Sequence, residues 1–238
     1  MNTFIQKKHL LAEVRKGDFT HPGGREAVDY VMSKVDITDK KLALDIGSGL
    51  GGTVDIMSKQ VPTAGIDRDI NAIQYSREKY GQHPFLLGDV MDIDQVASES
   101  YDLFTIFSAF YAFSDQKAAC TELAKKALPE SDLLVFDYSS QGVFEENLFY
   151  DDDSPFRPID LNDLTNIFSP WKILQVYDLT EMFHASYSDI LTSMHEQKEI
   201  LCHKHGQFAY DKVYEPFQNL VKHLEAGTLG GCLIHAQI

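Results

Sequence analysis

The chain has 238 residues, of which 44% are hydrophobic and 24% are charged, the proportions of a globular protein with one substantial core. Its formal net charge of −15 at pH 7 argues against a nucleic-acid substrate, because a polyanion is repelled at long range unless a local basic patch intervenes. The pairs Lys7-Lys8 and Lys125-Lys126 are interpreted as solvated helix faces rather than as such a patch.

The cysteines and the N-terminal sequence indicate the compartment. Cys120, Cys202 and Cys232 are scattered and odd in number, so no disulfide framework is predicted and a reducing, cytoplasmic setting is expected. The N-terminus has no long apolar run, and we therefore expect neither a signal peptide nor a membrane span.

From Lys41 to Tyr138 the chain alternates short apolar runs with amphipathic stretches. Strands are predicted over 41–46, 63–67, 84–87, 101–107 and 133–138, with helices after the glycines at 51–52, over 70–80 and over 115–128. Asp115 is the expected N-cap of the last of these helices and Pro129 its end. The alternation predicts a parallel sheet with right-handed crossovers and helices on both faces.

The last third of the chain breaks this rhythm. Its pattern predicts a short helix over 160–168, a strand over 171–178, a mainly helical stretch over 180–225 and a final strand over 229–237. A helical insert cannot extend the sheet, so we expect it to fold over the C-terminal edge of the strands, where open α/β sheets bind ligands.

The predicted fold class is therefore α/β, with a Rossmann-like, seven-stranded, mostly parallel sheet and helices on both faces. We expect an N-terminal helical cap at 1–40 and one domain at 41–238, whose insert at 180–226 forms a lid together with that cap.

A glycine-rich turn, LDIGSGLGG at residues 44–52, follows the first predicted strand. Its glycines fit the dinucleotide pattern G-x-G-x-x-G, with Asp67 20 residues after Gly47. They equally fit the D-x-G-x-G-x-G turn of enzymes that use S-adenosylmethionine (SAM). Asp45 favours SAM, because a carboxylate attracts its ammonium and sulfonium groups and would repel a pyrophosphate. We expect Asp45, Gly47, Ser48 and Gly49 to hold this cofactor.

Acidic residues also end the next two predicted strands. Asp67 is expected to accept the ribose hydroxyls, and Arg68 to cover an adenine face. Asp89 is expected to accept the adenine amino group, with Val90 offering a backbone N–H. Each acid alone is a common loop residue, but three acids at three successive strand ends indicate a nucleoside-binding edge.

Several segments together resemble the class I SAM-dependent methyltransferases: 45–52, 65–67, 88–90 and 133–138. Within that superfamily, the glycine turn, the loop at 23–27, the stretch at 178–181 and the ending at 230–236 are similar to the phosphoethanolamine N-methyltransferases and their relatives acting on sarcosine and dimethylglycine. The resemblance implies SAM as cofactor, S-adenosylhomocysteine as product, and direct transfer of a methyl group to a small molecule, at an amine nitrogen.

The residues after the fourth predicted strand depart from that family's pattern. Ala112 stands where the family has an active-site histidine, and Ser108 stands where an acidic residue is common; Ser108 is nevertheless expected at the cofactor. Tyr138 matches the family's tyrosine after the fifth strand, and we expect it to position the acceptor.

The acceptor side offers weaker candidates. His21 is either the base that deprotonates an amine or a solvent-facing loop histidine. Tyr111 is expected to contact substrate as part of an aromatic wall with its phenylalanine neighbours at 107, 110 and 113, which alternatively belong to the core. Tyr150 and Arg157 are interpreted as holders of an anionic acceptor group, or as surface residues.

No metal is expected. In Cys202-His203-x-His205, residues two apart on a helix do not face one another, and no further ligand cluster follows at zinc-binding spacing. The sequence thus predicts a SAM-dependent methyltransferase of a small acceptor, acting as a monomer or homodimer without nucleic acid or membrane. An NAD-dependent oxidoreductase and a SAM-binding protein without catalytic activity are the alternatives.

Overall fold

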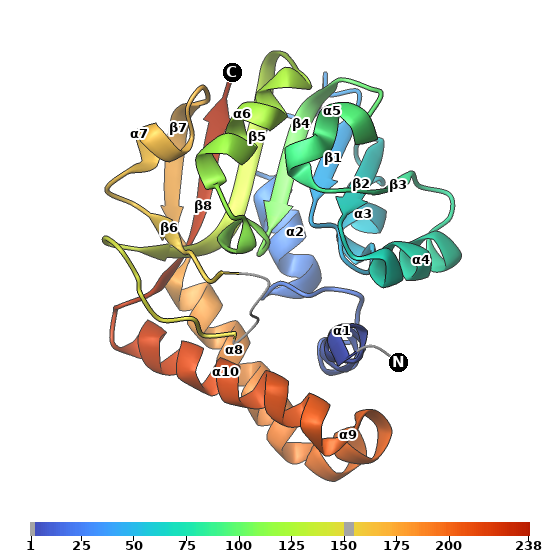
Figure 1. Cartoon of the computed structure of the whole chain (residues 1–238), viewed down its shortest axis with the longest axis vertical. Coiled ribbons are helices and arrows are strands. Elements are labelled where there is room, and N and C mark those ends of the chain that lie inside the picture. Colours follow the sequence, from blue (N-terminus) through green and yellow to red (C-terminus); the bar gives the residue numbers. More distant parts are fainter. Residues whose placement is uncertain (1–2, 150–154) are drawn as a thin grey trace.

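The computed structural model describes residues 3–149 and 155–238, with residues 3–6 described by their backbone alone. At the centre lies one β-sheet with the strand order β3-β2-β1-β4-β5-β8-β7, and a two-residue strand, β6, pairs with β5 beside this path (Figure 1). The strands are β1 (Ala43–Ile46), β2 (Thr63–Asp67), β3 (Phe85–Leu87), β4 (Tyr101–Phe107), β5 (Ala127–Ser140), β6 (Ile159–Asp160), β7 (Lys172–Asp178) and β8 (Gly230–Gln237).

The direction of the strands confirms a mostly parallel sheet. Every pairing is parallel except the two that β8 makes with β5 and β7. The chain runs from β1 outward to β2 and β3, then returns to place β4 on the other side of β1. This reversal at β1 opens a crevice at the C-terminal ends of the strands, where ligands bind in such sheets.

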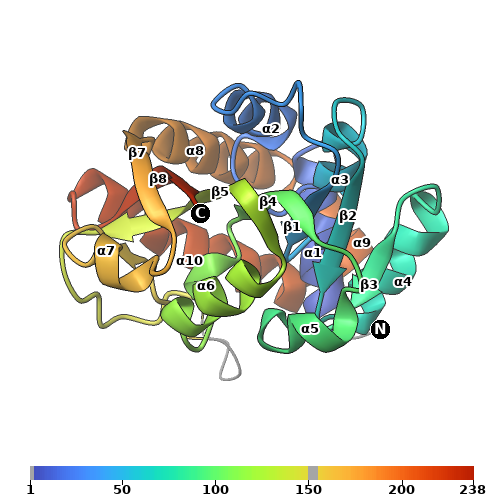
Figure 2. The same cartoon turned by 90° about the horizontal axis from the view of Figure 1, so that it is seen from above.

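Two helical layers cover the faces of the sheet (Figure 2). α2 (Gly24–Met32), α3 (Gly52–Met57) and α8 (Thr180–Glu196) lie on one face, and α5 (Ile93–Val96), α6 (Gln116–Lys125) and α7 (Leu164–Ile167) lie on the other. α4 (Ile70–Lys79) packs beside β2 and β3.

Alternation along β4 shows how the two layers arise. Leu103 and Phe107 belong to the buried cluster that includes α2 and α8, whereas Phe104 and Ile106 belong to the cluster that includes α5 and α6. Successive side chains of a strand point to opposite faces, so an almost continuous apolar run is what a sheet buried on both faces requires.

The lid consists of α1 (Thr3–Val14), α8, α9 (Lys198–His205) and α10 (Gln207–Glu225), which lie across one edge of the sheet, at the bottom of Figure 1. Ion pairs hold α1 in place: Glu13 Oε2 lies 2.7 Å from Lys204 Nζ and 2.8 Å from His205 Nε2 on α9. This arrangement confirms the predicted lid, with one refinement. α2 packs against α3 in a sheet layer, so only the first helix of residues 1–40 reaches the lid.

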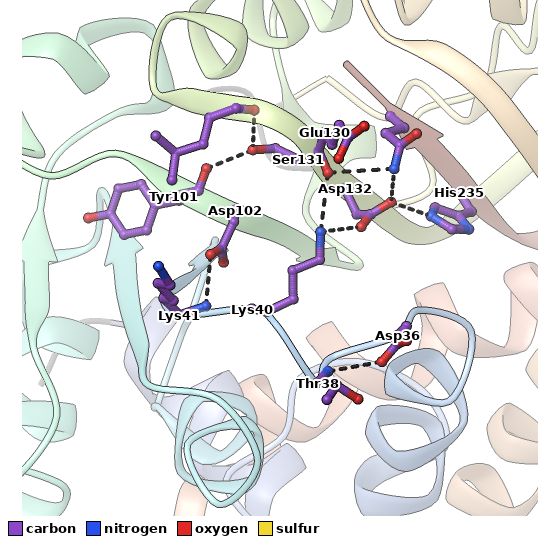
Figure 3. A network of polar contacts seen from close by, with 12 residues as sticks. Asp36, Thr38, Lys40, Lys41, Tyr101, Asp102, Glu130, Ser131, Asp132 and His235 are labelled. Carbon is purple, nitrogen blue, oxygen red and sulfur yellow. Dashed lines mark hydrogen bonds and ion pairs between the residues drawn. The ribbon is translucent and has the colours of Figure 1, made fainter.

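A polar network fastens the opposite edge, where β1 and β4 begin (Figure 3). Asp132 in β5 accepts from Lys40 at 2.5 Å and interacts with His235 in β8 at 2.7 Å. Asp102 Oδ2 accepts from the backbone N–H of Lys41 at 2.7 Å. The network joins β1, β4, β5 and β8 at their far end and has no part in the crevice.

Two predicted helix boundaries are wrong. α6 begins at its N-cap Asp115 as predicted, but it ends at Lys125 because the chain from Ala127 onward joins β5, so Pro129 lies in a strand. The predicted helix at 160–168 is the strand β6 followed by the short helix α7, because Ile159 and Asp160 pair with the end of β5. In both places pairing with a neighbouring strand overrides local helix propensity.

Candidate functional site

A cavity of about 270 Å³ lies between the C-terminal ends of the parallel strands and the lid. Gly47, Asp67, Asp89, Ser108 and Tyr138 line it from the ends of β1, β2, β3, β4 and β5. The lid contributes residues of α1, α8 and α10: Lys7, Lys8, Leu11, Tyr187, Lys212, Val213, Pro216 and Phe217. Five successive strand ends therefore converge on one ligand-sized space, as the sequence predicts.

The glycine turn forms the floor of this cavity. Gly47 and Gly49 both have positive φ, 76° and 54°, and a Cβ on Gly47 would lie 2.5 Å from the Cβ of Ala109. Only glycine avoids that clash and tolerates that backbone conformation. The turn is held from β2, because the backbone N–H of Gly49 donates to Asp67 Oδ2 at 2.8 Å.

Acidic side chains mark one end of the cavity. Asp67 Oδ1 accepts from the backbone N–H of Asp69 at 2.8 Å, and Lys8 Nζ lies 3.9 Å from Asp67 Oδ2. Asp89 Oδ1 accepts from the backbone N–H of Met91 at 3.0 Å. A carboxylate has about four acceptor positions, so these bonds leave both side chains able to accept from a ligand. Arg68 and Val90 line the cavity beside them.

Ser108 marks the junction between the two ends. Its backbone is left-handed, with φ of 47° in a residue other than glycine, and its Oγ is buried without a hydrogen-bond partner among the described residues. Strained backbone and an unsatisfied buried hydroxyl concentrate at functional sites. Their coincidence in one cavity-lining residue indicates a ligand contact.

The other end of the cavity is aromatic. Five lining rings contact one another there: Tyr111, Tyr138, Phe149, Tyr187 and Phe217. Phe113 also lines the cavity, but its ring packs against Phe110. The hydroxyls of Tyr138 and Tyr187 contact each other. Burial raises the pKa of Tyr138 well above its ordinary value and raises that of Tyr187 to about 12, so both phenols are protonated at neutral pH. Of the predicted aromatic wall, Tyr111 and Phe113 line the cavity, whereas Phe107 and Phe110 lie in the core.

A buried carboxylate, Asp137, shapes this aromatic end from beneath. Its Oδ2 accepts from the backbone N–H groups of Phe110, at 2.7 Å, and Tyr111, at 3.3 Å, which fixes the short helix η2 (Phe110–Ala112) against β5. Burial raises the pKa of Asp137 to about 7, although these hydrogen bonds act in the opposite direction. Sequence reasoning missed this residue because it reads as one polar position in an apolar strand.

Asp45 and His21 are buried and lie outside the cavity lining. Asp45 is buried beneath the turn, where Thr105 donates to its Oδ1 at 2.9 Å, and burial raises its pKa to about 7. His21 is 2% exposed, and its Nδ1 donates to the Pro22 carbonyl at 2.9 Å while Nε2 accepts from Thr53 at 3.2 Å. Burial lowers the pKa of His21 to about 3, so it is neither a solvent-facing histidine nor within reach of an acceptor.

The placement of His21 has a physical reason. Its ring packs between Phe19 and Phe107, with centroids 5.4 and 4.9 Å away, so the His21 side chain turns into the core although its neighbour Thr20 lines the cavity. The expectation of a base at this position is corrected accordingly.

The remaining predicted residues are Ser48, Arg157 and Tyr150. Ser48 is buried against Gly65 in β2, and does not line the cavity. Arg157 is exposed, and its Nη1 contacts the Ser114 carbonyl, so it too lies outside the lining. Tyr150 lies outside the described residues.

The lid residues were missed by sequence reasoning. Lys8, interpreted as part of a solvated pair, has a side chain only 12% exposed, with Nζ 3.3 Å from Asp69 Oδ2. Tyr187 and Phe217 carry no motif, and the only signal in the sequence is the spacing of apolar residues along two helices.

Within residues 7–149 and 155–238, no group of histidine, cysteine and carboxylate side chains is arranged to hold a metal ion. No helix in the described part of the chain is both long and apolar enough to cross a membrane.

The strand order, its single antiparallel insertion and a lidded cavity at the switch point define a Rossmann-like fold of the methyltransferase type. Residues 44–135 match the family described as "Methyltransferase domain". This segment, which is less than half of the chain, is similar in sequence to that family, and the resemblance drawn from the glycine turn and strand ends is confirmed. No curated protein matches the chain in sequence.

Solved structures share the fold at low sequence identity. Phosphoethanolamine N-methyltransferase 2 of Haemonchus contortus, bound to phosphomonomethylethanolamine and S-adenosylhomocysteine, is 16% identical, with a TM-score of 0.84 over 96% of this chain and 56% of that chain. The cyclopropane synthase MmaA2 of Mycobacterium tuberculosis is 14% identical, with a TM-score of 0.82 over 98% and 94%. A Galdieria sulphuraria protein assigned as a sarcosine dimethylglycine methyltransferase is 14% identical, with a TM-score of 0.77 over 89% and 84%.

These likenesses establish the fold and leave the acceptor open, because the three proteins act on different substrates by their names. The chain spans only a little over half the length of the Haemonchus contortus enzyme.

Proposed function

We propose that the chain transfers a methyl group from SAM to a small molecule, at an amine nitrogen. The observation that carries this proposal is the division of one cavity into an acidic, glycine-floored end and an aromatic end, both beneath the lid. The acidic end suits a nucleoside with cationic groups, and the aromatic end suits a compact acceptor.

The residues at the acidic end fit SAM. Gly47 and Gly49 permit close approach of a ligand to the backbone. Asp67 has acceptor positions for the ribose hydroxyls, and Asp89 with the Val90 backbone N–H suits the adenine edge. The unsatisfied Ser108 hydroxyl offers a partner to the amino-acid part of the ligand. When bound, SAM supplies a methyl group carried by a positively charged sulfur.

Asp45 supports a cationic ligand from below the turn. Its pKa of about 7 without ligand means that a nearby positive charge would favour its ionised form, whereas the dianionic pyrophosphate of NAD would oppose it. We therefore keep Asp45 as an electrostatic contributor and not as a direct ligand.

The aromatic end aligns the acceptor and excludes water. Methyl transfer is an in-line displacement, so the chain's contribution is to hold the acceptor lone pair toward the methyl group. Ring faces attract an alkylated ammonium, and the Tyr138 hydroxyl supplies a hydrogen bond. No histidine or carboxylate of the described residues lines this end, so an amine acceptor loses its proton to bulk water before it binds.

The test is calorimetric titration of the protein with SAM, S-adenosylhomocysteine and NADH in parallel. Micromolar binding of the two sulfur ligands without NADH binding is expected, followed by S-adenosylhomocysteine formation on a panel of small amines. Binding of NADH alone would restore the oxidoreductase alternative. SAM binding without transfer to any member of the panel would favour a SAM-binding protein without catalytic activity.

A further inference from the structure

A proline interrupts α10, one of the helices that close the cavity from the lid side (Figure 1). Pro216 lies inside this helix, and its side chain is buried. A proline at such a position removes one intrahelical hydrogen bond, and its ring collides with the carbonyl four residues earlier, so helix interiors strongly disfavour it. Departures from local sequence rules are expected where a function requires them.

The missing hydrogen bond lies on the side of α10 that faces the cavity. In an α-helix the N–H of each residue donates to the carbonyl four residues before it. Pro216 has no N–H, so it cannot donate to the carbonyl of Lys212. Both residues line the cavity, together with Val213 and Phe217, and residues at these spacings share one face of a helix. The Lys212 carbonyl oxygen, which points along the helix toward Pro216, therefore lies on the cavity wall.

This part of the wall belongs to the aromatic end of the cavity. The ring centroid of Phe217, the residue after Pro216, lies 4.8 Å from that of Tyr187 and 6.4 Å from that of Phe149. Backbone carbonyls in buried positions are normally paired, so a carbonyl that its own helix leaves without this bond is a hydrogen-bond acceptor for a ligand. It lies within about one helical turn of the rings that would surround the methyl acceptor.

A carbonyl changes what the rings alone would select. Aromatic faces attract an alkylated ammonium whether or not it carries an N–H. A carbonyl only accepts hydrogen bonds, so it favours a nitrogen that retains an N–H. For a neutral amine the same bond also orients the nitrogen, because the lone pair then points away from the carbonyl and is free to face the methyl group of SAM.

We propose that the Lys212 carbonyl, left free by Pro216, accepts an N–H from the nitrogen of the methyl acceptor, so that the site selects amines with an N–H over quaternary ammonium ions. Pro216 acts through this carbonyl and is a positioning residue. The proposal rests on the proposed function, since it assigns a contact of the nitrogen that receives the methyl group.

Binding of two cations to the full-length protein loaded with S-adenosylhomocysteine tests the proposal. N,N-dimethylethanolamine and choline both carry one positive charge at neutral pH, and a methyl group in choline replaces the N–H. Each is titrated calorimetrically against the wild type and the variants Pro216→Ala and Pro216→Val. Both substitutions supply the N–H that pairs with the carbonyl, and valine keeps more of the wall volume than alanine does. The matched control is Lys212→Ala, which removes the side chain and keeps the carbonyl. S-adenosylhomocysteine affinity and the melting temperature of each variant report whether the fold is retained.

We expect the wild type to bind N,N-dimethylethanolamine about tenfold more tightly than choline, which corresponds to one hydrogen bond from a charged donor. Both Pro216 variants should lose this preference, and Lys212→Ala should keep it. Equal binding of the two cations by the wild type would overturn the proposal, as would absence of binding of both. A preference that survives in both Pro216 variants, or that is lost in Lys212→Ala, would also overturn it. Failure of the wild type to bind S-adenosylhomocysteine would instead count against the proposed function, and titration of the unloaded protein with the two cations then judges the Lys212 carbonyl separately.

Discussion

Replacement of Asp67 by asparagine is the sharpest probe of the cofactor end. The substitution keeps the side-chain volume but removes the charge and one acceptor oxygen. In the wild type the two carboxylate oxygens accept from the backbone N–H groups of Gly49 and Asp69, each at 2.8 Å. In the asparagine variant, the side-chain NH2 replaces one carboxylate oxygen and faces a backbone N–H, so two hydrogen-bond donors oppose each other. The ribose hydroxyls then lose a charge-assisted hydrogen bond as well.

Hydrogen bonds to charged groups contribute about 1.5–3 kcal/mol each. We therefore expect Asp67→Asn to weaken SAM binding by about 1.5–3 kcal/mol, or roughly 10- to 150-fold in Kd. Calorimetric titration with SAM and with S-adenosylhomocysteine measures this loss directly, and the two ligands should lose equally because they share the ribose.

The matched control is Asp69→Asn. Asp69 pairs more closely with Lys8, at 3.3 Å, and accepts from the Asn71 N–H at the start of α4, but it does not line the cavity. We expect SAM affinity to change less than threefold in this variant. Unaltered SAM binding in Asp67→Asn, with the fold intact by melting temperature, would refute the ribose assignment. Equal losses in both variants would assign the effect to the lid contact with Lys8.

Three further predictions concern stability and pH. Asp132→Asn should lower the free energy of unfolding by on the order of 3 kcal/mol, because it leaves the Lys40 ammonium and the His235 ring without their buried partner. Burial acts to raise the pKa of Asp132, but hydrogen bonds from those two residues hold it below its ordinary 3.8. The stability that ionised Asp132 contributes is therefore present above pH 3.8 and is lost as the pH falls through the folded-state pKa. Denaturant melts of wild type and variant should converge in acid. His21→Phe should lower the free energy of unfolding by about 1–3 kcal/mol, because it leaves hydrogen-bonding groups unpaired. The pH profile of activity should stay unchanged, and an altered profile would indicate that His21 acts as a base. For an amine acceptor, kcat/KM should rise about tenfold per pH unit up to the pKa of the free amine, and the pH at which it levels off should differ between amines of different pKa. A rise near neutral pH that is the same for all amines would instead indicate a base in the enzyme. Tyr138 cannot be that base, because its pKa is raised.

The strand-end residues were predictable because their position depends on local sequence. An apolar run followed by a glycine turn or an acid identifies the C-terminal end of a strand, and parallel strands bring these ends to one edge. Gly47, Asp67, Asp89, Ser108 and Tyr138 all line the cavity for this reason. The final strand and the helical insert before it were equally visible as breaks in the alternation, but the antiparallel direction of β8 was not predicted.

Residues whose position depends on docking were not predictable. His21 has the sequence context of an exposed loop residue, but Phe107 and Phe136, which pack against its ring, come from segments distant in the sequence. Arg157 is exposed and does not line the cavity, because its guanidinium contacts the Ser114 carbonyl. Tyr187 meets Tyr138 only because α8 crosses the edge of the sheet.

By itself, the sequence therefore determined the order of elements, the parallel core and the acidic, glycine-floored end of the site, because each follows from hydrophobic periodicity and from turns within a few residues. Only the tertiary structure decided which helix faces close the cavity. Helix packing angles depend on side chains from two surfaces at once, and that information is not contained in either segment alone.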